Sequence, residues 1–179
     1  MGVDIGGTKT FVAALDDAGV ITEKVRFPTP RAYAEFVSKL KETAAALQTK
    51  NFRAGCAAVP GSIDRQRGIA RRLGNLPWRD VPLQEDAEHI FACPILLEHD
   101  AALGGLSEAM LLPKDTKVLY ITISTGIGTG FIDHQHIIPD LADSEGGQML
   151  LEYHGKPTKW EDFASGRAIA ARFGKQAVD

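Results

Sequence analysis

The sequence predicts an α/β protein, on three observations. Short apolar strands at residues 3–15 and 20–27 are separated by turn residues, the pattern of an antiparallel meander. Apolar residues at helical spacing follow over 31–48, and a strand-like apolar run follows over 52–59. Strands and helices continue to alternate after this point, which is the order typical of α/β folds.

Composition limits the classes of protein that fit. A chain of 179 residues forms one ordinary domain or two small ones, and 44% hydrophobic with 24% charged residues is typical of a soluble globular protein. A net charge of −3 gives no electrostatic reason to expect nucleic acid as a partner. No apolar run approaches the roughly 20 residues of a membrane span, and no basic leader precedes the first strand. We therefore expect a cytoplasmic protein without a membrane partner.

The two cysteines, Cys56 and Cys93, each stand among apolar residues. This setting favours reduced core thiols over a disulfide or metal ligands.

The first turn, Asp4–Thr10, combines a carboxylate, two glycines and two hydroxyls. Glycine permits positive φ and brings no Cβ, so backbone N–H groups and the hydroxyls of Thr8 and Thr10 can face an oxyanion. Asp4 at the strand end is suited to hold a cation or its waters. An ordinary glycine hairpin is the alternative, and the motif alone does not separate the two.

The next elements are predicted from periodicity and from Pro and Gly. The apolar positions of 31–48 lie on one helix face, and the apolar run 52–59 predicts a buried, parallel-type strand ended by Pro60-Gly61. Residues 63–71 predict a short exposed hairpin, residues 75–78 an irregular segment and residues 82–91 a helix.

A second half of the chain repeats the opening arrangement. After a strand at 95–98, a helix beginning at Asp100 should bury Leu103, Leu106 and Met110, and Lys114-Asp115 marks a seam. Strand 118–123 then enters a second glycine-rich loop at 124–130 and strand 131–132 leaves it, before a mixed stretch and a helix at 160–173. The sequence thus predicts two parts, residues 1–114 and residues 115–179.

Five motifs, in order and spacing, resemble the ROK family of glucokinase-like sugar kinases. They are Asp-x-Gly-Gly-Thr-Lys at Asp4–Lys9, Asn-Leu-Pro at Asn75–Pro77, Glu98-His99-Asp100, Thr-Gly-Ile-Gly-x-Gly at Thr125–Gly130, and Glu161–Gly166. The resemblance covers nearly the whole chain. It implies an actin-like, ribonuclease H-like fold, here with a complete N-terminal lobe and a partial second lobe.

The resemblance also implies roles for particular residues. ATP phosphates would meet one loop at Gly6, Gly7, Thr8 and Lys9, and the other at Thr125, Gly126, Gly128 and Gly130; Asp4 would act through water on Mg²⁺. Asp100 would be the base that accepts the proton of the attacking sugar hydroxyl. Helix capping is the alternative role of Asp100, because an aspartate at a helix start is common.

Hexose contacts implied by the resemblance fall on six positions, which are Gly61, Asn75, His99, Glu145, Gln148 and Glu161. Two of them depart from the family pattern: His99 stands where Asn is usual, and Gln148 where His is usual. Zinc-binding members carry three cysteines where this chain has none between Leu151 and Trp160. Without these ligands we expect no zinc.

The resemblance implies a chain that continues beyond residue 179 in other members. We therefore expect either an ATP-dependent hexose kinase or a catalytically inactive, incomplete sugar-binding relative that needs another chain or the remaining part. Association as a homodimer is compatible with a shortened second lobe. Transcriptional repressors of the same family fit less well, because they carry a DNA-binding helix-turn-helix before the first loop.

Overall fold

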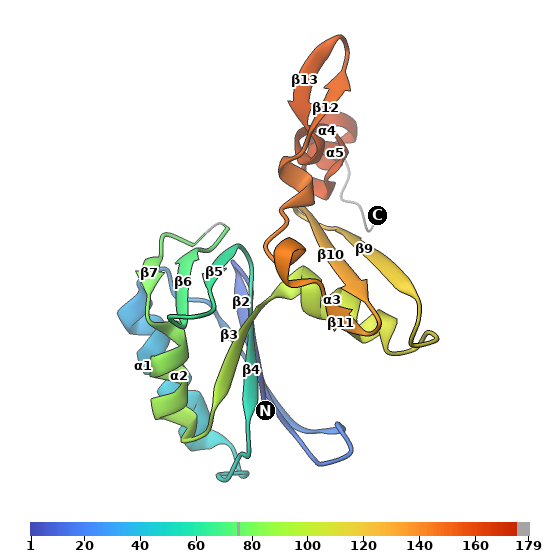
Figure 1. Cartoon of the computed structure of the whole chain (residues 1–179). Helices are drawn as coiled ribbons and strands as arrows, with labels where there is room; N and C mark the ends of the chain where they lie inside the picture. Colours follow the sequence, from blue (N-terminus) through green and yellow to red (C-terminus); the bar gives the residue numbers. More distant parts are fainter. Residues whose placement is uncertain (75, 175–179) are drawn as a thin grey trace. The chain divides into compact units, whose positions relative to one another are not determined.

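The computed structural model describes residues 1–74 and 76–174 (Figure 1). The chain divides into two compact units, Met1–Asp100 and Ala101–Asp179. Both contain sheets and helices, so the predicted α/β class is confirmed.

The first unit is built on a five-stranded sheet of order β3-β2-β1-β4-β8. Its strands are β1 (Gly2–Ile5), β2 (Lys9–Leu15), β3 (Ile21–Pro28), β4 (Gly55–Val59) and β8 (Ile95–His99). Strands β1, β2 and β3 form the predicted antiparallel meander. Strand β4 is parallel to β1 as predicted, although it begins at Gly55 rather than near residue 52, and β8 is parallel to β4.

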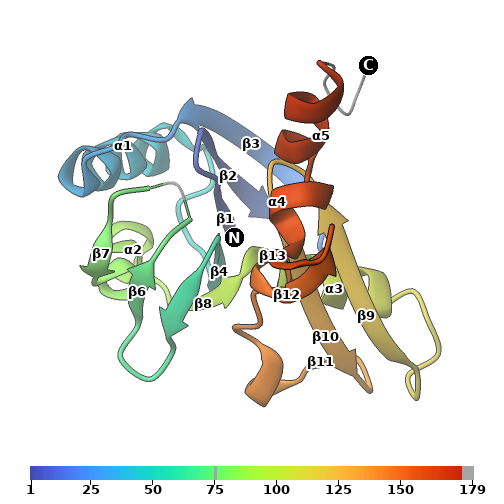
Figure 2. The ribbon, with the colours of Figure 1, turned by 90° about the horizontal axis from the view of Figure 1, so that it is seen from above.

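Two helices cover one face of this sheet, α1 (Tyr33–Ala46) and α2 (Leu83–Phe91) (Figures 1 and 2). Side chains alternate along β1, so Val3 and Ile5 are buried while Asp4 between them is exposed. Phe36 and Leu40 of α1 are fully buried in the same core. This apolar layer fixes which side chains of β1 are left for chemistry.

A second, three-stranded sheet lies between β4 and α2 in the chain. It consists of β5 (Ser62–Asp64), β6 (Ile69–Arg72) and β7 (Arg79–Val81). The predicted hairpin is present, but its exposure was predicted wrongly, because Ile63 and Ala70 are buried in the core of the unit. Strand β7 was not predicted, and Trp78 just before it is also buried, with its ring 4.6 Å from that of Phe36.

The second unit contains a three-stranded antiparallel sheet, a hairpin and short helices. Its elements are α3 (Asp100–Ala109), β9 (Lys117–Ile123), β10 (Ile127–Asp133), β11 (His136–Ile137), the 3-10 segments η1 (Pro139–Leu141) and η2 (Gly146–Gln148), β12 (Leu150–Tyr153), β13 (Lys156–Lys159), α4 (Trp160–Ala164) and α5 (Gly166–Phe173). The helix predicted over 160–173 is interrupted at Ser165, whose side chain instead caps α5 by accepting from the Ala168 N–H at 3.2 Å.

Helix α3 packs through its small residues, which corrects the predicted buried face. Ala101, Ala102, Gly105 and Ala109 are buried, while Met110 just beyond the helix is 59% exposed. A Cβ at Gly105 would lie 2.8 Å from the Cβ of Tyr120 on β9, so only glycine allows this close approach. The helix therefore packs with β9 and β10, and the boundary between the units falls at Asp100/Ala101 rather than at the predicted seam near Lys114.

One row of apolar side chains on β9 is exposed. Leu119, Ile121 and Ile123 are 56%, 43% and 55% exposed, whereas the alternate residues of the strand are half-buried. Strand β9 is also the edge of its sheet among the described residues. An apolar row on an edge strand favours association with other polypeptide.

Within the part of the chain that the structure describes, none of the helices has the length and apolar character needed to cross a bilayer.

Close packing predicts different costs for two glycine-to-alanine changes. A Cβ at Gly130 of β10 would lie 2.5 Å from the carbonyl oxygen of Ala101 in α3, whereas a Cβ at Gly2 would meet nothing within 4 Å. We expect Gly130→Ala to lower the free energy of unfolding by about 1–3 kcal/mol. Gly2→Ala should leave it within about 0.5 kcal/mol. Urea unfolding of both variants measures the difference, and equal stabilities would contradict the packing described.

Candidate active site

The carboxyl ends of three parallel strands meet at one edge of the first unit's sheet. Asp4 of β1 pairs with Ala58 of β4, and Ala58 pairs with Glu98 of β8. The segments that leave this edge carry the first glycine loop, Gly61, and the pair His99-Asp100. Ligands of open α/β sheets bind beyond the carboxyl ends of parallel strands, so this edge is the candidate site.

The first loop is held in place by hydrogen bonds rather than by unusual backbone angles. Gly6 N–H donates to the Lys9 carbonyl at 3.0 Å, and a Cβ on Gly6 would lie 2.9 Å from that oxygen. Glycine is therefore required here for close approach, and the expected positive φ is not found at Gly6 or Gly7. The loop residues Gly7, Thr8 and Lys9 are exposed, which leaves them accessible to a ligand.

Thr29 braces this loop from the end of β3, a role that the sequence did not reveal. Its hydroxyl donates to the Gly6 carbonyl at 2.7 Å, and its N–H donates to the Thr8 carbonyl at 3.0 Å. The Thr10 hydroxyl lies 2.9 Å from the Thr29 hydroxyl, and Thr10 is fully buried. The expectation that Thr10 faces an oxyanion was wrong, because its side chain points into this internal network.

Asp4 lies in an unfavourable electrostatic setting. Partial loss of hydration raises the pKa of its carboxyl, the charge of Asp100 raises it further, and Lys24 and Lys9 oppose the shift. A carboxylate beside a second negative charge also attracts a cation. The residues at this edge therefore fit a hydrated divalent ion such as Mg²⁺.

Asp100 stands at the predicted strand-to-helix junction. It follows β8 directly and is the first residue of α3, with 44% of its side chain exposed. His99 before it is 3% exposed, and its Nδ1 lies 3.5 Å from Asp100 Oδ1. A carboxylate fixed at a helix start and open to solvent suits either a base or a cap, so the local geometry permits both roles.

Gly61 occupies a backbone conformation that excludes other residues. Its φ is 113°, and a Cβ there would lie 2.1 Å from the Arg72 carbonyl oxygen. The predicted position Asn75 lies outside the described residues.

In the second unit, the glycines of the second loop differ in their surroundings. Gly128 and Gly130 lie within β10, where a Cβ on either would come within 3.0 Å of Ala101. Thr125 is exposed and Gly126 half-buried at the tip of the loop, where the Gly126 carbonyl accepts from the Ser124 N–H at 2.9 Å. Among the four predicted phosphate contacts, Thr125 is therefore the most accessible, while Gly126 and Gly128 are half-buried and Gly130 is buried.

Two predicted sugar residues come together beside this loop. The Gln148 amide donates to Glu161 Oε1, and Glu161 Oε2 lies 3.0 Å from where a Cβ on Gly126 would be. Glu145 precedes the 3-10 segment η2, and its carbonyl accepts from the Gln148 N–H at 2.9 Å. Glu145 and Gln148 at the two ends of η2 thus lie with Glu161 of α4.

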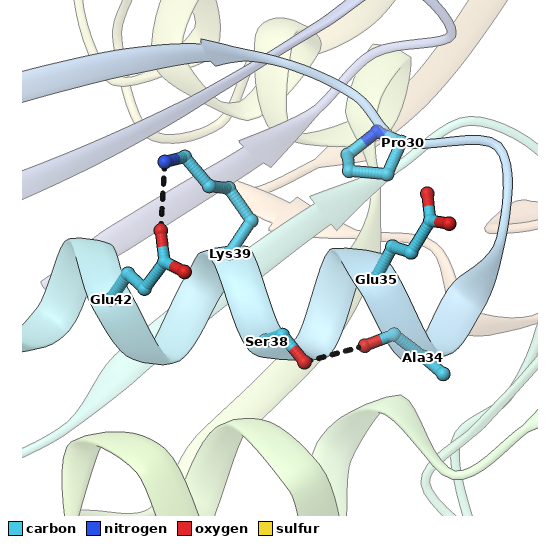
Figure 3. A pocket seen from close by; sticks show the side chains of 6 residues that line it. All are labelled: Pro30, Ala34, Glu35, Ser38, Lys39 and Glu42. Atoms are coloured by element: carbon cyan, nitrogen blue, oxygen red, sulfur yellow. Dashed lines mark hydrogen bonds and ion pairs between the residues drawn. The ribbon is translucent and has the colours of Figure 1, made fainter.

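A surface hollow of about 460 Å³ lies elsewhere in the first unit, along α1 (Figure 3). Its lining residues are Pro30, Ala34, Glu35, Ser38, Lys39 and Glu42, and Lys39 pairs with Glu42 at 2.8 Å. None of them is a predicted site residue, so this hollow does not serve the candidate site.

Apart from Asp4, the described residues offer neither a clear metal site nor a reactive thiol. The described residues contain no cluster of three or more His, Cys, Asp or Glu side chains that would hold a metal. Both cysteines are free thiols, as expected. Burial raises the pKa of the Cys56 thiol to about 11 and also raises that of Cys93, which makes both poor nucleophiles at neutral pH.

Comparison with known proteins decides the family. The model of the ROK family matches residues 1–179, the whole chain. The chain belongs to the ROK family. The predicted resemblance is confirmed, and with it the actin-like fold that the family's sugar kinases share.

Relatives of this ROK chain include kinases and a repressor. It is 32% identical to the glucokinase of Streptomyces coelicolor over 200 residues, covering 100% of this chain and 60% of the relative. It is 29% identical to the xylose repressor of Bacillus subtilis over 121 residues, 62% of this chain and 31% of the repressor.

Among solved structures, a ROK glucokinase from Streptomyces griseus in complex with glucose and AMPPNP superimposes with a TM-score of 0.80. The two share 27% identity over 95% of this chain and 58% of the other. This ROK chain thus spans about 60% of the length of these two glucokinases.

The partial burial of Asp4, together with the nearby charge of Asp100, predicts a pH-dependent effect of Asp4→Asn. The folded-state pKa of Asp4 is raised, so its ionised form weakens the folded state above that pKa and the neutral form does not. Asp4→Asn should therefore raise the free energy of unfolding at pH 7 by a few tenths of a kcal/mol, up to about 1, since the group is exposed and screened.

This gain should shrink as pH falls through the raised pKa and vanish below the unfolded value of 3.8. Urea unfolding at pH 7 and pH 4.5 measures it, with Asp115→Asn as an exposed control. A stability loss at pH 7 would contradict the described burial and charge repulsion of the Asp4 carboxylate.

Proposed function

We propose that this ROK chain carries the machinery for ATP-dependent phosphorylation of a hexose hydroxyl, with Asp100 as the base. The observation that carries the proposal is the meeting of Asp4, Gly61 and His99-Asp100 at the carboxyl edge of β1, β4 and β8. The kinase names of its relatives support sugar phosphorylation in general.

In the proposed reaction Asp100 accepts the proton of the sugar hydroxyl. The hydroxyl oxygen forms a bond to the γ-phosphorus of ATP, the bond from that phosphorus to the β-γ bridging oxygen breaks, and ADP leaves. The placement of the Asp100 carboxylate matters more for this role than its basicity, because proton transfer is late in a loose transition state. Its place at the junction of β8 and α3 supplies that position.

The phosphates are assigned to the exposed parts of the glycine loops. Backbone N–H groups of Gly7 and Thr8 and the Lys9 ammonium would neutralise phosphate charge at the first loop. Gly6, whose N–H donates to the Lys9 carbonyl, would shape that loop. Thr125 and Gly126 would contribute from the other, with Gly128 and Gly130 shaping it. Mg²⁺, held through water by Asp4, would supply charge neutralisation of the phosphates when bound.

The sugar is assigned to Gly61, Asn75, His99, Glu145, Gln148 and Glu161. Paired side chains such as Gln148 and Glu161 can both donate and accept, which suits the hydroxyls of a hexose. The His99 side chain is almost completely buried. Its ring would therefore contact only a sugar that lies against the end of β8. We propose no zinc and a cytoplasmic location, and neither nucleic acid nor membrane as a partner.

A second candidate function is sugar binding without phosphoryl transfer. It is favoured by the two departures from the family pattern, His99 and Gln148. Such a relative would need another chain, or the remaining part of the family fold, for catalysis.

Turnover separates the two functions. The kinase predicts ADP release in a coupled assay with at least one of glucose, mannose, fructose or an N-acetylated hexosamine, in the presence of ATP and Mg²⁺. Binding of a sugar by calorimetry without ADP release from any of them would reject the kinase and favour the binding relative.

Asp100→Asn tests the assigned base. The change removes the proton acceptor but keeps the shape of the side chain, so kcat should fall by at least about 100-fold while sugar affinity changes less than about threefold. Steady-state kinetics and calorimetry measure the two quantities, with exposed Asp115→Asn as the matched control. Unchanged kcat in Asp100→Asn would show that Asp100 only caps α3.

The exposed row on β9 supports self-association of this chain as a homodimer. Leu119, Ile121 and Ile123 lie on one face of an edge strand, so a second copy packed on that face would bury them. Ile121→Lys should therefore shift the chain toward monomer in sedimentation velocity, while exposed Val20→Lys should not. A wild-type chain that stays monomeric over a 100-fold concentration series up to high-micromolar concentration would contradict the homodimer.

A further inference from the structure

We propose that Arg65 is a positioning residue for Asp100 and acts through the carboxylate of Glu98. This inference rests on the proposed function, in which Asp100 is the base. None of the motifs that place the chain in its family contains Arg65.

Arg65 joins the small sheet to the edge that carries the site. It stands in the turn between β5 and β6, and its Nε donates to Glu98 Oε2 at 3.1 Å. Its Nη2 donates to Glu98 Oε1, so the guanidinium binds both oxygens of one carboxylate. A bidentate pair of this kind fixes orientation as well as distance.

Glu98 passes this constraint to the residues that follow it. Its Oε1 also accepts the N–H of His99 at 2.7 Å. The ring of His99 lies 3.5 Å from the Asp100 carboxylate, measured from Nδ1 to Oδ1. Arg65, Glu98, His99 and Asp100 thus form a continuous chain of contacts that ends at the proposed base.

The Glu98 end of this ion pair is sheltered from water. The side chains of Arg65 and Glu98 are 33% and 17% exposed, so water screens them less than it screens a surface ion pair. Glu98 also lies in the row that β1, β4 and β8 form with Asp4 and Ala58. The guanidinium therefore adds positive charge to a row that holds two carboxylates.

The turn that carries Arg65 is itself held. Arg71 pairs with Asp64 at 2.6 Å, and Asp64 Oδ1 accepts the N–H of Arg67 at 3.1 Å. The Arg67 side chain is exposed and belongs to the same turn. Arg67→Gln therefore removes an equal charge from this turn without touching Glu98, which makes it the matched control.

Two measurements on the full chain test the proposal without relying on turnover. We expect Arg65→Gln to speed amide hydrogen exchange at His99 by about tenfold, the change that loss of one hydrogen bond of ordinary net strength produces. The ¹³C carboxyl signal of Asp100 should also shift, because its distance from the His99 ring changes. Arg65→Lys should not fully restore the wild-type His99 exchange rate or the wild-type Asp100 signal, since a single ammonium cannot replace the bidentate guanidinium.

Kinetics add a third measurement where the wild type turns over. Arg65→Gln should lower kcat about tenfold with sugar KM changed less than twofold, because the base is displaced while the sugar contacts remain. Arg67→Gln should leave kcat, the His99 exchange rate and the Asp100 signal unchanged.

The proposal is overturned where Arg65→Gln leaves the Asp100 signal at its wild-type position, or where kcat is unchanged in an active chain. It is also overturned where Arg67→Gln produces the same effects, because the cause would then be general loss of charge. A wild type without turnover rejects the proposed kinase alone, and the Asp100 signal then decides the role of Arg65.

Discussion

The parallel register of β1, β4 and β8 is the constraint on which the rest of the site depends. In this register Val3, Ile5 and Val59 face the helices and are buried, while Asp4 and Glu98 fall on the alternate positions. A slip of one residue in β1 would move Asp4 into the apolar core and Ile5 out of it. The burial of a few aliphatic side chains thus decides where the carboxylates stand.

Much of the first unit could be predicted from local sequence, because its signals are local. The meander, α1, α2 and the apolar strand before Gly61 follow from periodicity and turn residues. Strand β7 did not, since three residues containing Arg79 and Asp80 carry no alternation. The buried face of α3 was also missed, because close packing against Tyr120 favours small residues over the leucines that hydrophobicity selects.

The motifs of the candidate site could be recognised in the sequence, but the contacts that hold these motifs in place could not be predicted from it. Thr29 and Arg65 act on residues far from them in the chain, and neither belongs to a recognisable pattern. The glycines of the two loops look alike in sequence yet serve different purposes. Gly6 lets a carbonyl come close, whereas Gly130 lets a helix come close. The spacing of glycines in the sequence identifies such positions, but only the fold shows which group each glycine allows to come close.

The central claim is that hexose binds at the carboxyl edge of the first sheet. Backbone amide shifts of the ¹⁵N-labelled chain, recorded during titration with glucose, mannose or fructose, test it directly. We predict that the largest shifts in the first unit fall on Gly61, His99 and Asp100, with Phe36 and Leu40 of α1 unmoved. Shifts centred instead on Ala34 and Ser38 beside the hollow of α1, or none with any hexose at millimolar concentration, would contradict the account.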